Sequence, residues 1–101
     1  MAYKTIILRE AQREYESIVA YMVETLDNLQ AARAFRDEFR LRVDQVCELP
    51  TMCPLSRMPE LAARGYRTLI VANYVVLYKI SENAIVIAHV FHQSQDYAKL
   101  V

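Results

Sequence analysis

The chain has 101 residues, 54% of them hydrophobic, and its 12 Lys and Arg balance its 12 Asp and Glu. A domain of this length buries roughly 65% of its unfolded surface, so one apolar core suffices without disulfides or metals. No apolar run approaches the ~20 residues that span a bilayer, and zero net charge is untypical of a dedicated nucleic-acid binder. We expect a single cytoplasmic domain over residues 1–101, with no membrane partner.

The first half of the chain carries one strand pattern and then two helix patterns. Residues 3–8, YKTIIL, are aromatic and β-branched, which predicts a strand. An apolar stripe at helical spacing follows, through Ala11, Tyr15, Ile18, Met22 and Leu26. Asp27 or Asn28 can cap a second helix, which Pro50 ends. Its stripe consists of Ala32, Phe35, Phe39, Val43, Val46 and Leu49. The short connection between the two predicts an antiparallel helical hairpin.

The second half of the chain predicts three strands. Residues 50–65 hold all three prolines and the only glycine, as in an irregular connection. The segments 66–71, 74–80 and 84–91 are β-branched and aromatic, with short turns between them. A further turn is expected near the C-terminus. The order β-α-α-β-β-β predicts an α+β fold of two layers, with the helical hairpin packed on a mostly antiparallel four-stranded sheet.

Strict alternation along the last two strands assigns their side chains to faces. One face of residues 74–80 carries Tyr74, Val76, Tyr78 and Ile80. In the last strand one face carries Val86, Ala88, Val90 and His92, and the other carries Ile85, Ile87, His89 and Phe91. The two histidines therefore point to opposite faces, and no neighbouring pair of Cys or carboxylates completes a zinc site. We expect no metal and no cofactor, and we interpret Cys47 and Cys53 as free thiols, although pairing stays open.

Several segments match one known family in order and over nearly the whole chain. They are a strand that runs into an EA helix start, the hairpin segment AARAF, the pair of strands GYRTLIVANYVVLYKI, and the end VFHQSQDYAKL. In these features the chain resembles the RelE/ParE superfamily of type II toxin–antitoxin systems, which serve plasmid stabilisation. The resemblance implies a small toxin held inactive by a cognate antitoxin. Some members cut mRNA on the ribosome and others poison DNA gyrase. A homodimer or a toxin–antitoxin hetero-oligomer both stay open.

The resemblance also points to candidate site residues. Metal-free RNA cleavage needs proton transfer and stabilisation of the charge on the phosphate. His92 suits proton transfer, and Tyr97 can orient or stack a base or donate a proton. Arg67 and Arg64 can hold phosphate oxygens. Each has an ordinary structural alternative, because strand ends, C-terminal turns and exposed strand positions commonly carry such residues.

Two departures from the RNA-cutting members decide our preference. Those members carry arginines at the places of Val75 and Gln95. The loss of such a donor typically costs 10²–10³ in rate. We therefore expect a growth inhibitor that contacts a protein target, plausibly gyrase. One alternative is a metal-independent mRNA endonuclease, and another is a member that binds its antitoxin without toxicity. A basic concavity holding Arg67, His92 and Lys99 would favour the nuclease.

Overall fold

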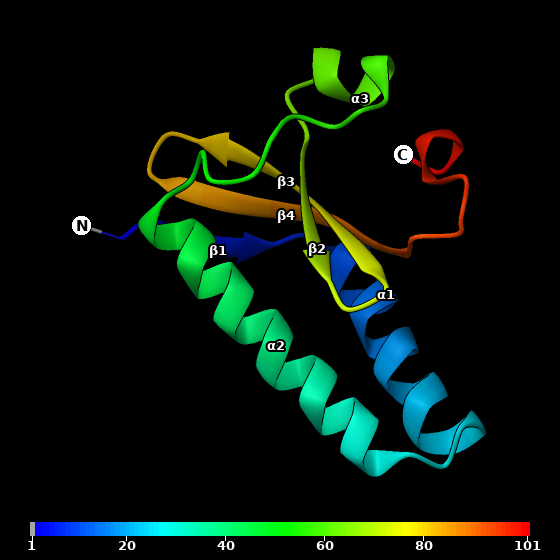
Figure 1. Ribbon diagram of the computed structural model, residues 1–101. Coiled ribbons are helices and arrows are strands. Elements are labelled where there is room, and N and C mark those ends of the chain that lie inside the picture. Colours follow the sequence, from blue (N-terminus) through cyan, green and yellow to red (C-terminus); the bar gives the residue numbers. More distant parts are fainter. Residues whose placement is uncertain (1) are drawn as a thin grey trace.

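The computed structural model describes residues 2–101 (Figure 1). Its strands are β1 (Lys4–Ile7), β2 (Arg67–Val71), β3 (Tyr74–Ser81) and β4 (Ala84–His92). Its helices are α1 (Arg9–Ala20), α2 (Leu29–Glu48) and the short α3 (Pro59–Ala63). A π-helical turn at Tyr21–Thr25 extends α1, and a 3-10 turn at Tyr97–Lys99 lies near the C-terminus. Within residues 2–101 no helix is long and apolar enough to cross a membrane.

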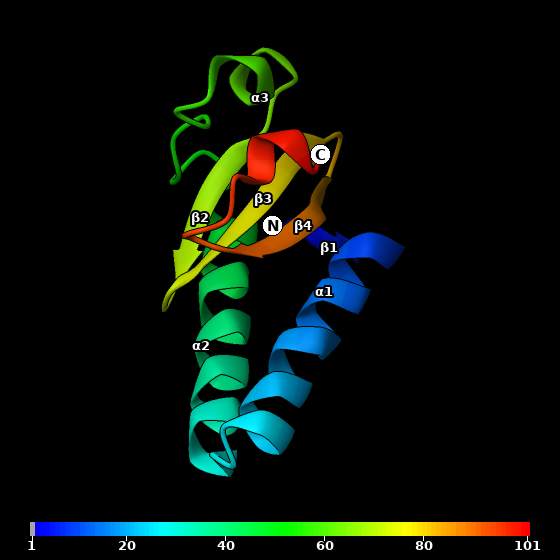
Figure 2. The same cartoon turned by 90° about the vertical axis from the view of Figure 1, so that its right-hand side faces the viewer.

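The sheet has the order β1-β4-β3-β2. Strand β1 is parallel to β4, whereas β2, β3 and β4 form an antiparallel meander. Helices α1 and α2 cover one face of the sheet, and α3 and the C-terminal turn lie toward the other face (Figures 1 and 2). The predicted α+β fold, with a helical hairpin on a mostly antiparallel sheet, is confirmed. The connection over 50–65 differs from the prediction because it contains α3, which Pro59 begins at the first helical position.

Two apolar clusters hold these layers together. The larger one joins the helical hairpin to the sheet, with Phe35 and Val46 from α2 packed near Leu69, Val76 and other buried strand residues. The smaller one lies on the opposite face and consists of Leu61, Tyr66, Val75, Leu77, Ala88 and Phe91. Complete burial of one such aliphatic side chain contributes about 1.5–3 kcal/mol. The two clusters explain why both faces of the central strands are apolar.

The assignment of β4 side chains to faces was wrong in part, because the strand contains a bulge. His89 pairs with Leu77, but Tyr78 pairs with Ile87, which leaves Ala88 as an extra residue. An extra residue reverses the alternation that follows it. Ile85, Ile87 and Val90 consequently share the cluster under the helices. Ala88 and Phe91 belong to the opposite cluster.

The end of the first helix also departs from regular periodicity. The Leu26 N–H donates to the Tyr21 carbonyl five residues earlier, at 3.0 Å, so this turn is π-helical. The wider turn displaces Leu26 from the apolar stripe, and this side chain is 53% exposed. Asn28 caps α2, since its Oδ1 accepts the Ala31 N–H at 2.9 Å. Leu49 lies just beyond α2 and is exposed rather than buried.

Candidate functional site

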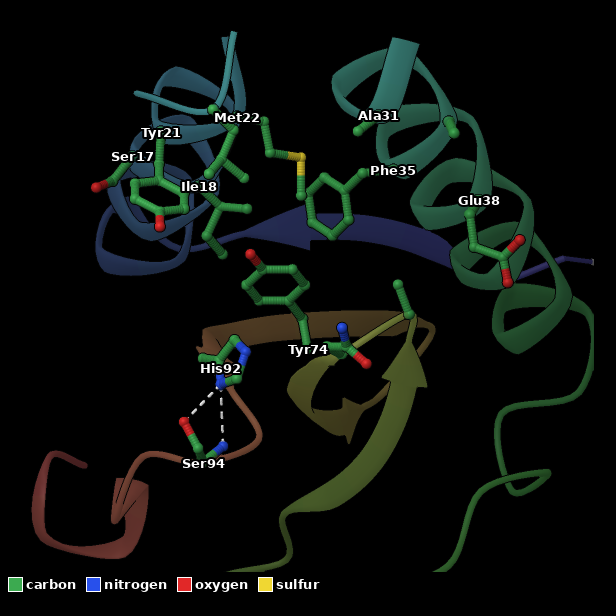
Figure 3. Close-up of a pocket in the computed structure, with 14 residues that line it drawn as sticks. Ser17, Ile18, Tyr21, Met22, Ala31, Phe35, Glu38, Tyr74, His92 and Ser94 are labelled. Atoms are coloured by element: carbon green, nitrogen blue, oxygen red, sulfur yellow. Dashed lines mark hydrogen bonds between the residues drawn. The ribbon is translucent and has the colours of Figure 1, made fainter. Parts of the chain in front are cut away.

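A broad cleft separates the distal half of the helical hairpin from the end of the sheet where β2 turns into β3. Its volume is about 1030 Å³, and Figure 3 shows Met22, Phe35 and Tyr74 directed into it. Ile18 and Ala31 add to its apolar lining. The cleft follows from topology, because the hairpin extends past the sheet while the turn at 72–73 stays short. Among the described residues Glu38 is the only charged side chain that lines it.

Tyr74 forms the aromatic centre of this cleft. Its ring lies 5.1 Å from that of Phe35 and 5.4 Å from that of His92, which meets it edge-on at 88°. Such tilted and edge-to-face pairs are favourable arrangements of aromatic rings. Burial is the main cause that raises the pKa of Tyr74 above its usual value. The hydroxyl therefore stays protonated at neutral pH, and a partner in the cleft meets a hydrogen-bonding group rather than a charge.

His92 borders the cleft but is engaged in its own turn. The Ser94 N–H donates to His92 Nδ1 at 3.1 Å, and the Ser94 hydroxyl lies 2.7 Å from the same nitrogen. Nδ1 is thus occupied within the turn, and Nε2 is the ring nitrogen that these two contacts leave open. The His92 backbone N–H donates to Gln95 Oε1 at 2.8 Å. Gln95 thereby closes the turn that ends β4.

Tyr97 lies away from the cleft. Its ring stacks on Phe91 with centroids 5.8 Å apart, and both rings belong to the cluster on the face opposite the helices. Because successive strand residues point to opposite faces, Phe91 and His92 diverge. The structure thus separates His92 from Tyr97, although they are only five positions apart in sequence.

Both candidate arginines lie at the other end of the sheet. Arg67 donates from Nη1 to the Cys53 carbonyl at 2.6 Å, and its strand partner is Tyr78. The strand partner of His92 is Tyr74, four residues along β3, which corresponds to roughly 13 Å. The Arg64 guanidinium lies over the Tyr66 ring, 5.2 Å from its centre. The four candidates His92, Tyr97, Arg67 and Arg64 therefore do not form one site in this structure.

Lys99, the other cation of the basic concavity that would favour a nuclease, lies beside an acidic neighbour. The Lys99 ammonium is 3.4 Å from the Asp96 carboxylate, with both side chains exposed. Within residues 2–101 no three His, Cys, Asp or Glu side chains gather where an ion would bind. Cys47 and Cys53 are buried free thiols.

The sequence patterns did not predict one polar contact, between Glu14 on α1 and the end of β4. Glu14 on α1 accepts the Val90 N–H at 3.0 Å and lies 3.3 Å from His89 Nδ1. Strand β1 pairs only with residues 84–87 of β4, so the Glu14 carboxylate satisfies the edge of β4 beyond that point. Glu14 falls outside the apolar stripe of its helix, and nothing in the sequence marks it as different from the neighbouring exposed glutamate, Glu16.

The sequence and the fold of this chain both match known proteins. Residues 6–97 match the family model described as the ParE toxin of the type II toxin–antitoxin system parDE. No curated protein matches the sequence. A chain of the chromosomal ParDE toxin–antitoxin system from P. aeruginosa shares the fold with a TM-score of 0.72 and 16% identity, over 90% of this chain and 96% of that one.

Two further solved structures share the fold. A chain of the toxin–antitoxin complex RelBE2 from Mycobacterium tuberculosis gives a TM-score of 0.61 and 18% identity, over 91% of this chain and 99% of that one. A conserved protein from Helicobacter pylori gives 0.57 and 8% identity, over 92% of this chain and 97% of that one. The family match spans nearly the whole chain, and the chain therefore belongs to the ParE toxin family of type II toxin–antitoxin systems.

Proposed function

We propose that this chain is a cytoplasmic growth inhibitor that acts by binding a protein target, DNA gyrase in the manner of ParE toxins, and that a cognate antitoxin neutralises it. Family membership supports the toxin role. The two structural relatives from toxin–antitoxin systems support the antitoxin partner. The observation that carries the choice of target is the apolar cleft, in which Glu38 is the only charged side chain among the described residues.

The character of the cleft favours protein contact over phosphate chemistry. A phosphodiester carries negative charge, and the described lining of the cleft offers it no cation, only the Glu38 carboxylate, which lies 3.8 Å from the Arg42 guanidinium. Cleavage would also need proton-transfer groups and cations that converge on one phosphate. Arg67 instead donates to the Cys53 carbonyl, and Tyr97 stacks on Phe91 away from the cleft. These contacts support a toxin that does not cut RNA.

The rim of the cleft supplies side chains that a protein partner can bury. Tyr21 and Leu26 at the hairpin tip are 51% and 53% exposed. Large aromatic and aliphatic side chains beside an apolar groove are the usual anchors of protein interfaces. Together with Tyr74 inside the cleft, they form a surface suited to a complementary apolar segment of a target protein.

The proposal is tested by an obstruction placed at the cleft. Ala34 lines the cleft and its side chain is exposed, so Ala34→Arg adds bulk and charge without opening the core. We expect the variant to lose at least about tenfold of its potency, both in arresting growth and in inhibiting the supercoiling activity of purified gyrase. Ala63→Arg, at an exposed position of α3, is the matched control and should retain both activities.

Transcript mapping separates the alternatives. After induction of the unmodified chain without an antitoxin, transcript 5′ ends should stay as in uninduced cells. New ends inside coding regions that disappear with His92→Ala would establish the mRNA endonuclease instead. Normal growth combined with intact gyrase activity would indicate a member that binds an antitoxin without toxicity.

A further inference from the structure

The two sides of the cleft differ in chemistry, and this difference bears on what can bind there. Figure 3 shows Ser17 and Tyr21 on the α1 side of Tyr74, and Phe35 and Glu38 on the α2 side. The first three supply hydroxyl groups, whereas Phe35 supplies apolar surface and Glu38 a carboxylate. A partner in the cleft therefore meets apolar side chains, a few hydrogen-bonding groups and one negative charge.

The cleft faces the end of the sheet rather than an edge. Val71 and Tyr74 pair with each other beside the turn between β2 and β3, and Tyr74 also pairs with His92. The His92 N–H donates to Gln95 Oε1. Among the described residues no strand therefore presents a row of free backbone groups to the cleft. An extended segment buried there would leave its own N–H and C=O groups without partners, whereas a helix satisfies them internally.

The size of the cleft also suits a helix. Its volume is about 1030 Å³. A helix with its side chains is about 10 Å wide and rises about 5.4 Å per turn, so one turn occupies roughly 400 Å³. The cleft has room for about two turns. An amphipathic helix carries its apolar side chains three and four residues apart on one face, and this stripe can pack on Ile18, Met22 and Phe35.

Glu38 determines the charge that such a helix should carry. Its carboxylate lies 3.8 Å from the Arg42 guanidinium, and both side chains are partly exposed, so this ion pair contributes little energy. A lysine or arginine of the partner can therefore join or replace Arg42 at the carboxylate. An additional carboxylate in the cleft would be repelled instead.

The same charge disfavours a second copy of this chain in the cleft. The tip of the helical hairpin is the exposed apolar segment that could enter the cleft of another copy. Residues 17–31 of this tip include Glu24 and Asp27 but no Lys or Arg. Insertion of the tip would bring these carboxylates toward Glu38 of the other copy, whereas a basic helix of a different protein has no such penalty.

We propose that the cleft binds one amphipathic helix of the target protein, of which about two turns lie between the hairpin and the sheet end with a lysine or arginine on Glu38. This inference rests on the proposed function, since it specifies the part of the target that enters the cleft. Glu38 is then the residue that selects the charge of the partner. The apolar stripe gives the complex its affinity, and the pairing with Glu38 gives it specificity.

The test uses the purified full chain and two synthetic peptides of about 16 residues, a length at which a helix can form on binding. Both carry a stripe of leucines at helical spacing, flanked by lysines in one peptide and by glutamates in the other. We expect the lysine peptide to become helical on binding, as read by circular dichroism, and to shift the NMR signals of the Met22 methyl group and the Tyr74 ring. It should bind at least about tenfold more tightly than the glutamate peptide.

Reversal of the charge at residue 38 tests the pairing itself. Glu38→Lys, at an exposed position, should bind the glutamate peptide more tightly than the lysine peptide. Glu16→Lys is the matched control, because Glu16 is exposed on α1 and does not line the cleft. This control should keep the preference for the lysine peptide within about twofold. Since the two variants have the same net charge, a difference between them reports the position of the charge.

A third peptide, with proline in the middle of the leucine stripe, should not bind because proline breaks a helix. The inference is overturned if the lysine peptide leaves the Met22 and Tyr74 signals unchanged, if the proline peptide binds equally well, or if both charge variants keep the same preference. None of these readouts involves growth or gyrase. A failed peptide test together with lost gyrase inhibition in Ala34→Arg would reject the helix and retain the proposed function, and the reverse pattern would do the opposite.

Discussion

The two histidines of β4 lie three residues apart but belong to different kinds of structure. His89 meets Glu14, which comes from α1, 75 positions earlier in the chain. The hydrogen bonds of His92 go to Ser94 and Gln95 within its own turn, and its ring also meets Tyr74 on the neighbouring strand. The His89 contact therefore joins two layers of the fold, while the His92 contacts shape one strand end. A polar contact that joins distant segments should matter for stability, and a local one should matter little.

The largest effect is expected at Glu14. Its side chain is only 24% exposed, and Glu14→Ala leaves the Val90 N–H without its acceptor. We expect a loss of about 2 kcal/mol in the free energy of unfolding, because a buried donor without a partner costs about 1–3 kcal/mol. Urea denaturation measures this loss. Glu16 is exposed and lies two residues after Glu14 on the same helix. Glu16→Ala should change the free energy of unfolding by less than about 0.5 kcal/mol. Equal effects at the two glutamates would contradict the comparison.

A smaller effect is expected for His89→Ala. The variant loses the contact with Glu14 and the stacking on Phe91, whose ring centre lies 5.0 Å away, but the hydrogen bond from Val90 to Glu14 remains. We expect a loss of about 1 kcal/mol. In a double-mutant cycle with Glu14→Ala, the two changes should cost less together than their sum, by about 0.5–1 kcal/mol. Strict additivity would show that the two side chains do not interact.

Tyr78 extends the comparison to another long-range contact. Its hydroxyl donates to the Pro50 carbonyl at 2.9 Å and so ties the core of the sheet to the end of α2. Tyr78→Phe should cost about 1 kcal/mol at neutral pH. Burial, and secondarily Cys53 beside it, raises the pKa of Tyr78 above its usual value.

The raised pKa predicts how stability depends on pH. Above about pH 10 the unfolded tyrosine loses its proton while the folded one keeps it. Stability is therefore fully present below about pH 10 and declines as pH rises from there toward the folded pKa. Denaturation series at pH 8 and above, on the unmodified chain and Tyr78→Phe, should show a shallower alkaline decline in the variant. Parallel declines would mean that Tyr78 titrates as in the unfolded chain.

These contacts mark the limit of what sequence patterns can predict. Hydrophobic periods of two and of three to four residues were enough for the meander, the helical hairpin and the layer order, since each period reports which side of an element is buried. The β4 bulge left no such signal. Its extra residue, Ala88, is as apolar as its neighbours, so the strand reads as regular although its faces exchange at that point.

The candidate site shows the same limit. His92 and Tyr97 are five positions apart in sequence, yet the alternation of β4 sends Phe91 and His92 to opposite faces, and Tyr97 stacks on Phe91. Arg67 is separated from His92 by strand register, which a residue pattern does not contain. Glu14 is the opposite case, because only the packing of α1 against the edge of β4 brings it to Val90. Local patterns predict elements, and the contacts between elements need the assembled fold.

The smallest effect is expected at His92, and it tests both halves of the comparison. His92→Ala removes the ring contacts with Ser94 and Tyr74. The hydrogen bond to Gln95 survives, because its donor is the backbone N–H of residue 92. The free energy of unfolding should change by less than about 0.5 kcal/mol, as for most exposed or half-buried positions whose side chains make no long-range hydrogen bond. Growth arrest should also persist, because a toxin that acts through an apolar cleft has no need of a proton-transfer group. Loss of toxicity in a stably folded His92→Ala chain would instead make the imidazole a chemical participant, and the local turn would then be a device that orients its Nε2 toward a substrate.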